Sequence, residues 1–238
     1  MINRNLVLVS GKSASGKSAS LRNLKDPEGV MFLNCESGKE LPFPNKFKSA
    51  VVTDPLQVFT SFEQAESMNV HTIVIDSLTF LMDMYESVYV LTSNDGRKAW
   101  GEYAQYFKKL MQYYVANSTK NVIMTGHTAD VYDESEMVMQ TRIKVKGSLM
   151  NNGIEAYFSQ VLASKVMSIQ QLSGYKNPLL NIDEEDELLG YKYCFQTKLT
   201  KETYHERIRA PLGMWNKEHT FIDNDIQKVI EHTHAYYS

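Results

Sequence analysis

Short apolar runs alternate with longer amphipathic segments through the first half of the chain. Apolar, often β-branched runs that are typical of buried strands cover residues 6–9, 30–33, 50–52, 71–75 and 122–125. Apolar residues recur at helical spacing over residues 17–24, 56–68, 80–91 and 97–115. Because strands that alternate with helices are joined by crossovers, this half predicts a mostly parallel sheet flanked by helices on both faces.

The second half has a different pattern, in which few segments show a helical period. Residues 142–145, 158–169, 191–199 and 204–208 favour strands, and residues 223–234 favour a closing helix. The acidic run at residues 183–187 is typical of a solvated loop. The chain therefore predicts one α/β domain over residues 1–238, with an α/β core at about 1–130 and a β-rich C-terminal extension of the sheet at about 140–238.

Composition narrows the class of protein. Hydrophobic residues make up 43% and charged residues 22% of the 238 residues, which are ordinary values for a soluble globular protein. The net charge of −3 excludes a global basic field, so a nucleic-acid contact would need a local basic patch.

Cysteine use and the lack of long apolar runs indicate a cellular compartment. Cys35 and Cys194 lie far apart in apolar segments, which favours two buried thiols over a disulfide or a metal site. No apolar run approaches the roughly 18 residues that span a membrane, and the first residues lack a signal-peptide profile. We expect a cytoplasmic protein without a membrane partner.

The octet GKSASGKS at residues 11–18 matches the phosphate-binding pattern G-x-x-x-x-G-K-[ST], and it lies between a predicted strand and a predicted helix. Gly11 and Gly16 allow a turn that aims backbone N–H groups at phosphates, and the helix adds the positive end of its dipole. We expect Lys17 to reach the β- and γ-phosphates of ATP and the Ser18 hydroxyl to bind Mg²⁺. The predicted nucleotide-binding residues are Gly11, Lys12, Ser13, Ala14, Ser15, Gly16, Lys17, Ser18 and Ala19.

Polar side chains follow three other predicted strands. Asp76 ends the run at residues 72–75, and a carboxylate at that end of a strand beside the phosphate-binding loop would hold Mg²⁺. No glutamate follows Asp76 directly, so Glu36, just past the second strand, is the candidate base for hydrolysis; the alternative is an exposed loop carboxylate. His127 is the candidate sensor of the γ-phosphate, and a structural histidine is the alternative.

Together with the phosphate-binding loop, these residues resemble the core of the RecA-like recombinases. IVIDSLTFL (73–81) resembles the Walker B strand and the following helix, and MFLNCESGKEL (31–41) resembles the segment with the catalytic glutamate. VIMTGHT (122–128) resembles the strand whose last polar residue couples the γ-phosphate to DNA binding, although RecA has glutamine where this chain has His127. The resemblance implies a RecA-like P-loop ATPase fold with a catalytic set of Lys17, Glu36, Asp76 and His127.

More narrowly, FQTKLTKETYHERIRAPLGMW (195–215) resembles the phage Sak4-type single-strand annealing and recombination ATPases. That resemblance implies a phage protein in the host cytoplasm that acts in DNA recombination. It also implies ATP-dependent assembly on single-stranded DNA, as an oligomer with ATP at its subunit interfaces. A helicase- or packaging-type DNA motor and a nucleotide-gated assembly factor with little hydrolysis are the alternatives.

Local basic residues supply candidate contacts to DNA and to a neighbouring subunit. RecA-like proteins bind DNA through segments that include the one after the strand predicted at residues 122–125. In this chain that segment is residues 128–147, of which 130–136 are acidic. Alternation places Arg142, Lys144 and Lys146 on one strand face, which favours either a stripe that tracks DNA phosphates or an edge strand protected by charge. Lys201 and Arg207 are the candidates for a cation that completes a neighbour's ATP site, with ordinary surface charge as the alternative.

Overall fold

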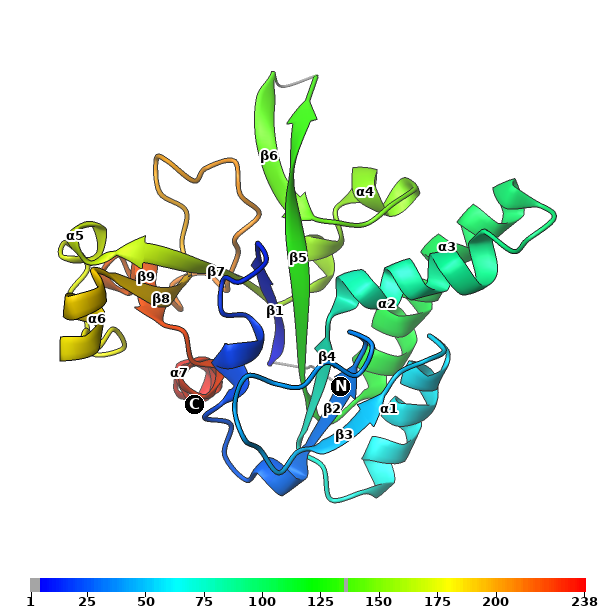
Figure 1. The fold of residues 1–238 in the computed structure, drawn as a ribbon, viewed down its shortest axis with the longest axis horizontal. Coiled ribbons are helices and arrows are strands. Elements are labelled where there is room, and N and C mark those ends of the chain that lie inside the picture. The colour runs from blue at the N-terminus through cyan, green and yellow to red at the C-terminus, as the bar shows by residue number, and fades with distance from the viewer. Residues whose placement is uncertain (1–4, 135–136) are drawn as a thin grey trace.

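The computed structural model describes residues 5–134 and 137–238, so positions 135–136 of the acidic stretch lie outside the described residues. The described strands form one mixed sheet (Figure 1). Its order is β3-β2-β4-β5-β1-β7-β8-β9, and β6 pairs with β5 beyond that path. The strands are β1 (Leu6–Gly11), β2 (Val30–Asn34), β3 (Lys48–Val51), β4 (Thr72–Asp76), β5 (Asn121–Asp133), β6 (Val138–Ile143), β7 (Gln160–Ser168), β8 (Tyr191–Gln196) and β9 (Phe221–Asp223).

The predicted mostly parallel sheet is confirmed. Strands β1 to β5 pair in parallel, and β7 adds to β1 in parallel before β8 and β9 continue the sheet antiparallel. The strand β9 was not predicted. Its three residues are too few for a period to emerge from the sequence.

Helices cover both faces of the sheet (Figure 1). Successive residues of β1 belong to different cores: Leu8 packs with one apolar cluster, and Val9 packs with the other. Burial on both faces explains why the central strands are continuous apolar runs. The first cluster lies against α1 (Gln57–Ser67), α2 (Leu78–Tyr85) and α3 (Gly96–Lys109), and the second lies against α7 (Ile226–Tyr237).

Shorter helical elements complete the described chain. The π-helical segments η3 (Glu86–Val90) and η4 (Leu110–Val115) continue α2 and α3, so the long helices predicted at 80–91 and 97–115 are each built from two parts. The remaining elements are η1 (Ser18–Leu21), η2 (Pro27–Gly29), α4 (Ser148–Asn152), η5 (Ile154–Tyr157), α5 (Ile169–Leu172), α6 (Glu184–Leu189) and η6 (Glu218–Thr220).

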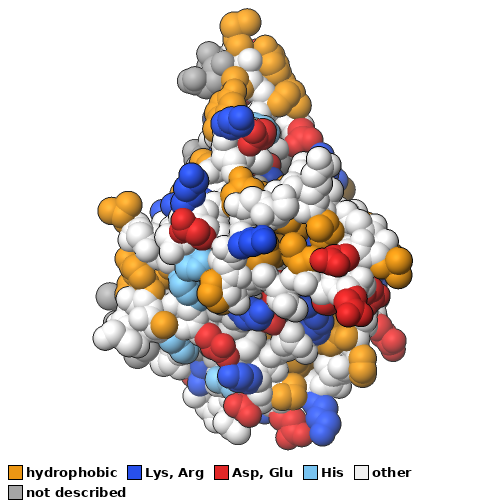
Figure 2. Space-filling view, turned by 90° about the vertical axis from the view of Figure 1, so that its left-hand side faces the viewer, with side chains coloured by type: hydrophobic (Ala, Val, Ile, Leu, Met, Phe, Trp, Pro, Cys, Tyr) orange, Lys and Arg blue, Asp and Glu red, His pale blue; other side chains and the backbone are white. Residues whose placement is uncertain are grey.

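The stretch at residues 128–147, where the resemblance implies contacts to DNA, contains a β-hairpin. Strand β5 runs for 13 residues, and its second half pairs antiparallel with β6. The hairpin projects from the body of the molecule (Figure 1), and Figure 2 shows mainly hydrophobic side chains at its far end. Tyr132, Met137 and Met139 are exposed there.

Three predicted elements are corrected. The acidic run at 183–187 is the first turn of α6, because Asp183 caps the helix and negative charges are favourable at a helix N-terminus. The helix expected at 17–24 is only the 3₁₀ turn η1, where the Ser20 hydroxyl donates to the Lys17 carbonyl. Residues 204–208 form no strand, because a turn in which Glu206 N donates to the Thr203 carbonyl carries this segment across the gap between β6 and β7.

Two further observations concern the cysteines and the helices. Cys35 and Cys194 are both buried and free, as the sequence predicts. None of the helices within residues 5–134 and 137–238 is long and apolar enough to cross a membrane.

Candidate functional site

The carboxyl ends of four parallel strands meet at one edge of the sheet and bring the predicted residues together. Gly11 at the end of β1 is in register with His127 on β5, and Asn34 at the end of β2 is in register with Asp76 at the end of β4. Glu36 follows β2 by two residues. Asn34, Glu36, Asp76 and His127, from three different strands and the loop after β2, therefore line one cavity of about 610 Å³.

The phosphate-binding loop connects β1 to η1. Ala14 and Gly16 have φ angles of +59° and +93°, so the loop passes through left-handed conformations. The buried Lys17 folds back under the loop, where its Nζ donates to the carbonyls of Gly11 at 3.1 Å and Lys12 at 2.7 Å. Burial lowers the pKa of Lys17 to about 8, although the nearby carboxylates partly offset this effect. The lysine thus occupies the position from which it could turn to a phosphate.

Asp76 is a buried carboxylate held by two hydroxyl groups. Ser18 Oγ donates to one oxygen of Asp76 at 2.8 Å, and Thr125 Oγ1 donates to the other oxygen. Burial raises the pKa of Asp76, and these hydrogen bonds act in the opposite direction. Thr125 was not among the predicted site residues. Its position at the end of an apolar run beside the Walker B strand is nevertheless where a polar site residue is expected.

Ser18 and Asp76 suit Mg²⁺ by the chemistry of their donor atoms. Mg²⁺ prefers oxygen ligands and is usually bound by one or two carboxylates, water and substrate phosphates. A hydroxyl and a carboxylate in contact at the foot of the loop fit that pattern. The described residues contain no cluster of three or more His, Cys, Asp or Glu side chains that could hold a metal alone, so phosphate oxygens would have to complete the ligand set.

Glu36 and His127 form a contact in the same cavity. His127 Nε2 lies 3.3 Å from Glu36 Oε1, and His127 Nδ1 lies 3.5 Å from Lys17 Nζ. The hydrogen bond to His127 is the main cause that lowers the pKa of Glu36 to about 2. Thr79 Oγ1 accepts from the backbone N–H of His127, and the ring of Phe80 meets the His127 ring edge-on, so the histidine is held from both sides.

Three further residues, which no sequence motif marks, also line the cavity. The ring of Tyr193 on β8 lies against Gly16, because a Cβ built on that glycine would be 2.9 Å from it. Asn224 is buried, and its Oδ1 has no hydrogen-bond partner among the described residues. Arg22 donates to the carbonyls of Ala19 and Asn224. Tyr193 and Asn224 come from the C-terminal half, where no motif marks them, and Arg22 directly follows η1.

The candidate DNA contacts do not form a free stripe. Strand β6 ends at Ile143, so the alternation expected over residues 142–146 does not continue in a strand. Arg142 pairs with Asp133 at 3.3 Å, and Lys146 pairs with Glu86. Lys144 is exposed.

The candidates for contact with a neighbouring subunit differ from one another. Lys201 is exposed and pairs with Glu202 at 3.6 Å, whereas Arg207 points inward to Glu155 at 3.3 Å. Arg207 therefore already has a partner within its own chain.

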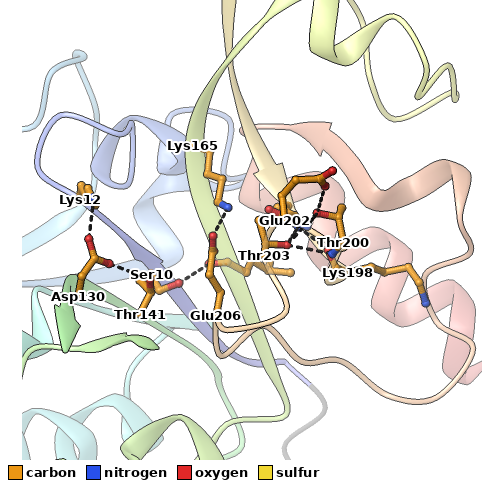
Figure 3. Close-up of polar contacts among 12 residues, drawn as sticks. Ser10, Lys12, Asp130, Thr141, Lys165, Lys198, Thr200, Glu202, Thr203 and Glu206 are labelled. Atoms are coloured by element: carbon orange, nitrogen blue, oxygen red, sulfur yellow. Dashed lines mark hydrogen bonds and ion pairs between the residues drawn. The ribbon is translucent and has the colours of Figure 1, made fainter. Parts of the chain in front are cut away.

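Figure 3 shows the ion pairs beside the phosphate-binding loop. Lys12 reaches Asp130 on β5 at 3.0 Å, and Lys165 on β7 reaches Glu206 at 2.6 Å. Lys12 belongs to the predicted nucleotide-binding set. Its side chain links the loop to the base of the hairpin.

Most of the chain matches a known protein family. The model of an AAA domain family, AAA_24, matches residues 3–188, which include the phosphate-binding loop, Glu36, Asp76 and His127. No curated protein matches the chain. The match supports a nucleotide-binding P-loop ATPase.

Proposed function

The chain belongs to the AAA domain family. We propose that it hydrolyses ATP with Mg²⁺ in the cavity at the carboxyl edge of the sheet. The observation that carries this proposal is the meeting of Lys17, the Ser18–Asp76 pair and the Glu36–His127 pair in one cavity. These groups would bind phosphate, hold a metal and accept a proton, which are the three tasks that phosphoryl transfer to water requires.

The nucleotide would lie along the cavity with its phosphates in the loop. Lys17 would leave the carbonyls of Gly11 and Lys12 and donate to the β- and γ-phosphates instead. The adenine ring would lie toward Tyr193 and Asn224. The exposed ring of Tyr193 can stack on a purine, and the unpartnered oxygen of Asn224 can accept a hydrogen bond from an exocyclic amine. Ser18 and Asp76 would hold Mg²⁺, which supplies charge neutralisation at the phosphate oxygens when it is bound.

Hydrolysis forms a bond between a water oxygen and the γ-phosphorus and breaks the bond from that phosphorus to the bridging oxygen of ADP. Glu36 would orient the water and take its proton. A carboxylate with a pKa of about 2 is a weak base, and its hydrogen bond to His127 is the main reason for that low value. We infer that a γ-phosphate draws His127 away from Glu36 and raises the basicity of the carboxylate where it is needed.

The substitution Glu36→Gln tests this proposal, and Glu102→Gln on α3 is its control. Glu36→Gln is expected to lower the turnover number about 100-fold or more while ATP still binds, since a positioned base contributes a factor of this size. Glu102 is exposed and pairs with Lys98, so its substitution should leave turnover unchanged. Unchanged turnover in Glu36→Gln would remove Glu36 from the mechanism.

For the biological role, we propose ATP-dependent DNA recombination or single-strand annealing by an oligomer in the cytoplasm of a host cell. The support is the resemblance to RecA-like and Sak4-type proteins, together with the exposed Lys144 and Lys201 as candidate contacts to DNA and to a neighbour. ATPase activity measured with and without single-stranded DNA, alongside oligomer size, tests this role. If DNA neither binds nor alters turnover, the recombination role is wrong.

A nucleotide-gated assembly factor with little hydrolysis is the second candidate. The restrained Glu36 favours it, because a base held by His127 would keep hydrolysis slow. Very slow turnover together with ATP-dependent assembly in the absence of DNA would favour this function over recombination.

A further inference from the structure

A second lysine lies over the proposed catalytic base. Lys39 Nζ is 3.4 Å from Glu36 Oε2, and Lys39 lines the same cavity as Lys17, Asp76 and His127. The Lys39 side chain is 73% exposed, whereas that of Glu36 is 13% exposed. The ion pair therefore joins an exposed cation to a carboxylate that is largely enclosed.

The backbone holds Lys39 at this position while its side chain is exposed. Asn34 Nδ2 donates to the carbonyl of Lys39 at 2.8 Å, and Asn34 Oδ1 accepts from the N–H of Glu36 at 2.9 Å. Ser37 and Gly38 between them have φ angles of +56° and +78°, which close a tight turn. One asparagine side chain at the end of β2 thus fixes the lysine and the glutamate relative to each other.

The other lysines and arginines that line this cavity within the described residues are already in use. Lys17 belongs to the phosphate-binding loop, and Arg22 donates to two carbonyls at the far end. Lys192 pairs with Asp186 at 2.5 Å and with Asp223 at 3.7 Å. Lys39 alone among them combines a long ion pair with high exposure.

We propose that Lys39 is a phosphate-binding residue that leaves Glu36 and donates to the terminal phosphate of ATP within the same chain. This inference rests on the proposed function. The ion pair is long and its lysine is exposed, so its loss is easily offset by a charge-assisted hydrogen bond to a doubly charged phosphate. The exchange frees Glu36 from a cation and places positive charge where negative charge develops during phosphoryl transfer.

The consequence is a site whose charge is completed in cis. A cation from a neighbouring subunit is then not required to bind the terminal phosphate, and binding of ATP should not depend on the protein concentration. ADP lacks that phosphate, so Lys39 should contribute little to ADP affinity.

The test compares ATP and ADP affinity in Lys39→Gln, Lys39→Arg and the control Lys98→Gln, with Mg²⁺ and a fluorescent nucleotide analogue of each kind. Lys98 is matched to Lys39, since it has the same 73% exposure and a 3.7 Å ion pair with Glu102 one helical turn away. Lys39→Gln is expected to weaken ATP binding about 10-fold or more and ADP binding less than about 3-fold, because a hydrogen bond to a charged group contributes about 1.5–3 kcal/mol. Lys39→Arg should recover part of the loss, and Lys98→Gln should bind as the wild type does.

A second measurement is the formation of a complex with ADP and aluminium fluoride. The Lys39→Gln protein should not form this complex at low protein concentration. An unchanged ratio of ATP to ADP affinity in Lys39→Gln would overturn this inference alone. A mixture of the Lys39→Gln protein with a Lys17→Ala protein tests action between subunits, because the second protein cannot use its own phosphate-binding loop but still carries Lys39. Recovery of ATP binding in this mixture would show that Lys39 acts on a neighbouring subunit, and it would also overturn the inference. If the wild-type protein binds no ATP, the proposed function fails first and this inference fails with it.

Discussion

Replacing Lys17 with methionine is expected to stabilise the nucleotide-free protein while it abolishes ATP binding. The ammonium group of Lys17 is buried beneath the phosphate-binding loop, where it is positioned for a phosphate and is poorly solvated. A methionine of similar length would fill the same space without the cost of burying a charge. Residues kept for function at the expense of stability behave in this way.

The size of the effect follows from two opposing contributions. The fall of the Lys17 pKa from 10.5 to about 8 corresponds to about 3 kcal/mol of destabilisation at pH 7, relative to an uncharged amine. An uncharged amine would still make the two hydrogen bonds to the carbonyls of Gly11 and Lys12, each worth about 1 kcal/mol, and methionine lacks both. The net gain for Lys17→Met is about 1 kcal/mol, or roughly 2–4 °C in melting temperature for a chain of this size.

The difference in stability between Lys17→Met and the wild type is expected to change sign with pH. Because the folded-state pKa lies below the unfolded value, the unfolded chain binds more protons between pH 8 and pH 10.5, and wild-type stability gains from this group as the pH rises through that window. Lys17→Met lacks the gain. The variant should therefore be the more stable protein at pH 7, the two should be equal near about pH 9, and the wild type should be more stable by about 1 kcal/mol at pH 10.

Urea unfolding at pH 7, 8, 9 and 10 with EDTA and without nucleotide measures these differences. Lys98→Met on α3 is the control, since the exposed Lys98 should show no crossover. A Lys17→Met protein that is less stable than the wild type at pH 7, or a difference that stays constant with pH, would refute the reasoning.

Three other substitutions have expected outcomes. Thr125→Val removes a hydrogen bond to the buried Asp76 and should lower the free energy of unfolding by about 1–3 kcal/mol in urea titrations; a loss below 0.5 kcal/mol would contradict the proposed support of Asp76. Gly16→Ala forces a side chain onto a φ angle of +93° and should abolish nucleotide binding in a fluorescence titration, so retained affinity would be the opposing result. Lys12→Gln breaks only the exposed pair with Asp130 and should change the free energy of unfolding by less than about 0.5 kcal/mol; a larger change would mean that this link stabilises the hairpin.

Several features of the fold followed from local patterns. The strands β1, β2 and β4 and the first half of β5 are buried on both faces, so their apolar runs are continuous and easy to recognise. The hairpin was harder to predict, because its outer residues face water and alternate weakly. The helix α6 was missed because its acidic residues read as solvated loop, although Asp183 and Asp186 form a capping box that the spacing alone permits.

Some residues of the candidate site could likewise be predicted from the sequence, and others could not. Gly16, Lys17 and Ser18 belong to a contiguous motif, so their grouping needed no knowledge of the fold. Glu36 and Asp76 were found because the carboxyl ends of parallel strands share one edge of the sheet. Their roles in hydrolysis stay predictions. Alternation placed Arg142, Lys144 and Lys146 on one face, and Ile143 and Val145 between them are buried, although β6 itself ends at Ile143. Their contact with DNA stays a prediction.

The sequence by itself determined the phosphate-binding loop, the position of Asp76 and the parallel core, because each depends on residues close together in the chain or on a regular period. Only the tertiary structure decided that Lys39 lies over Glu36, that His127 lies between Glu36 and Lys17, and that Tyr193 closes the far end of the cavity. These contacts join residues from separate strands and loops. They depend on distances of a few ångströms that the packing of the whole sheet sets and that no local pattern records.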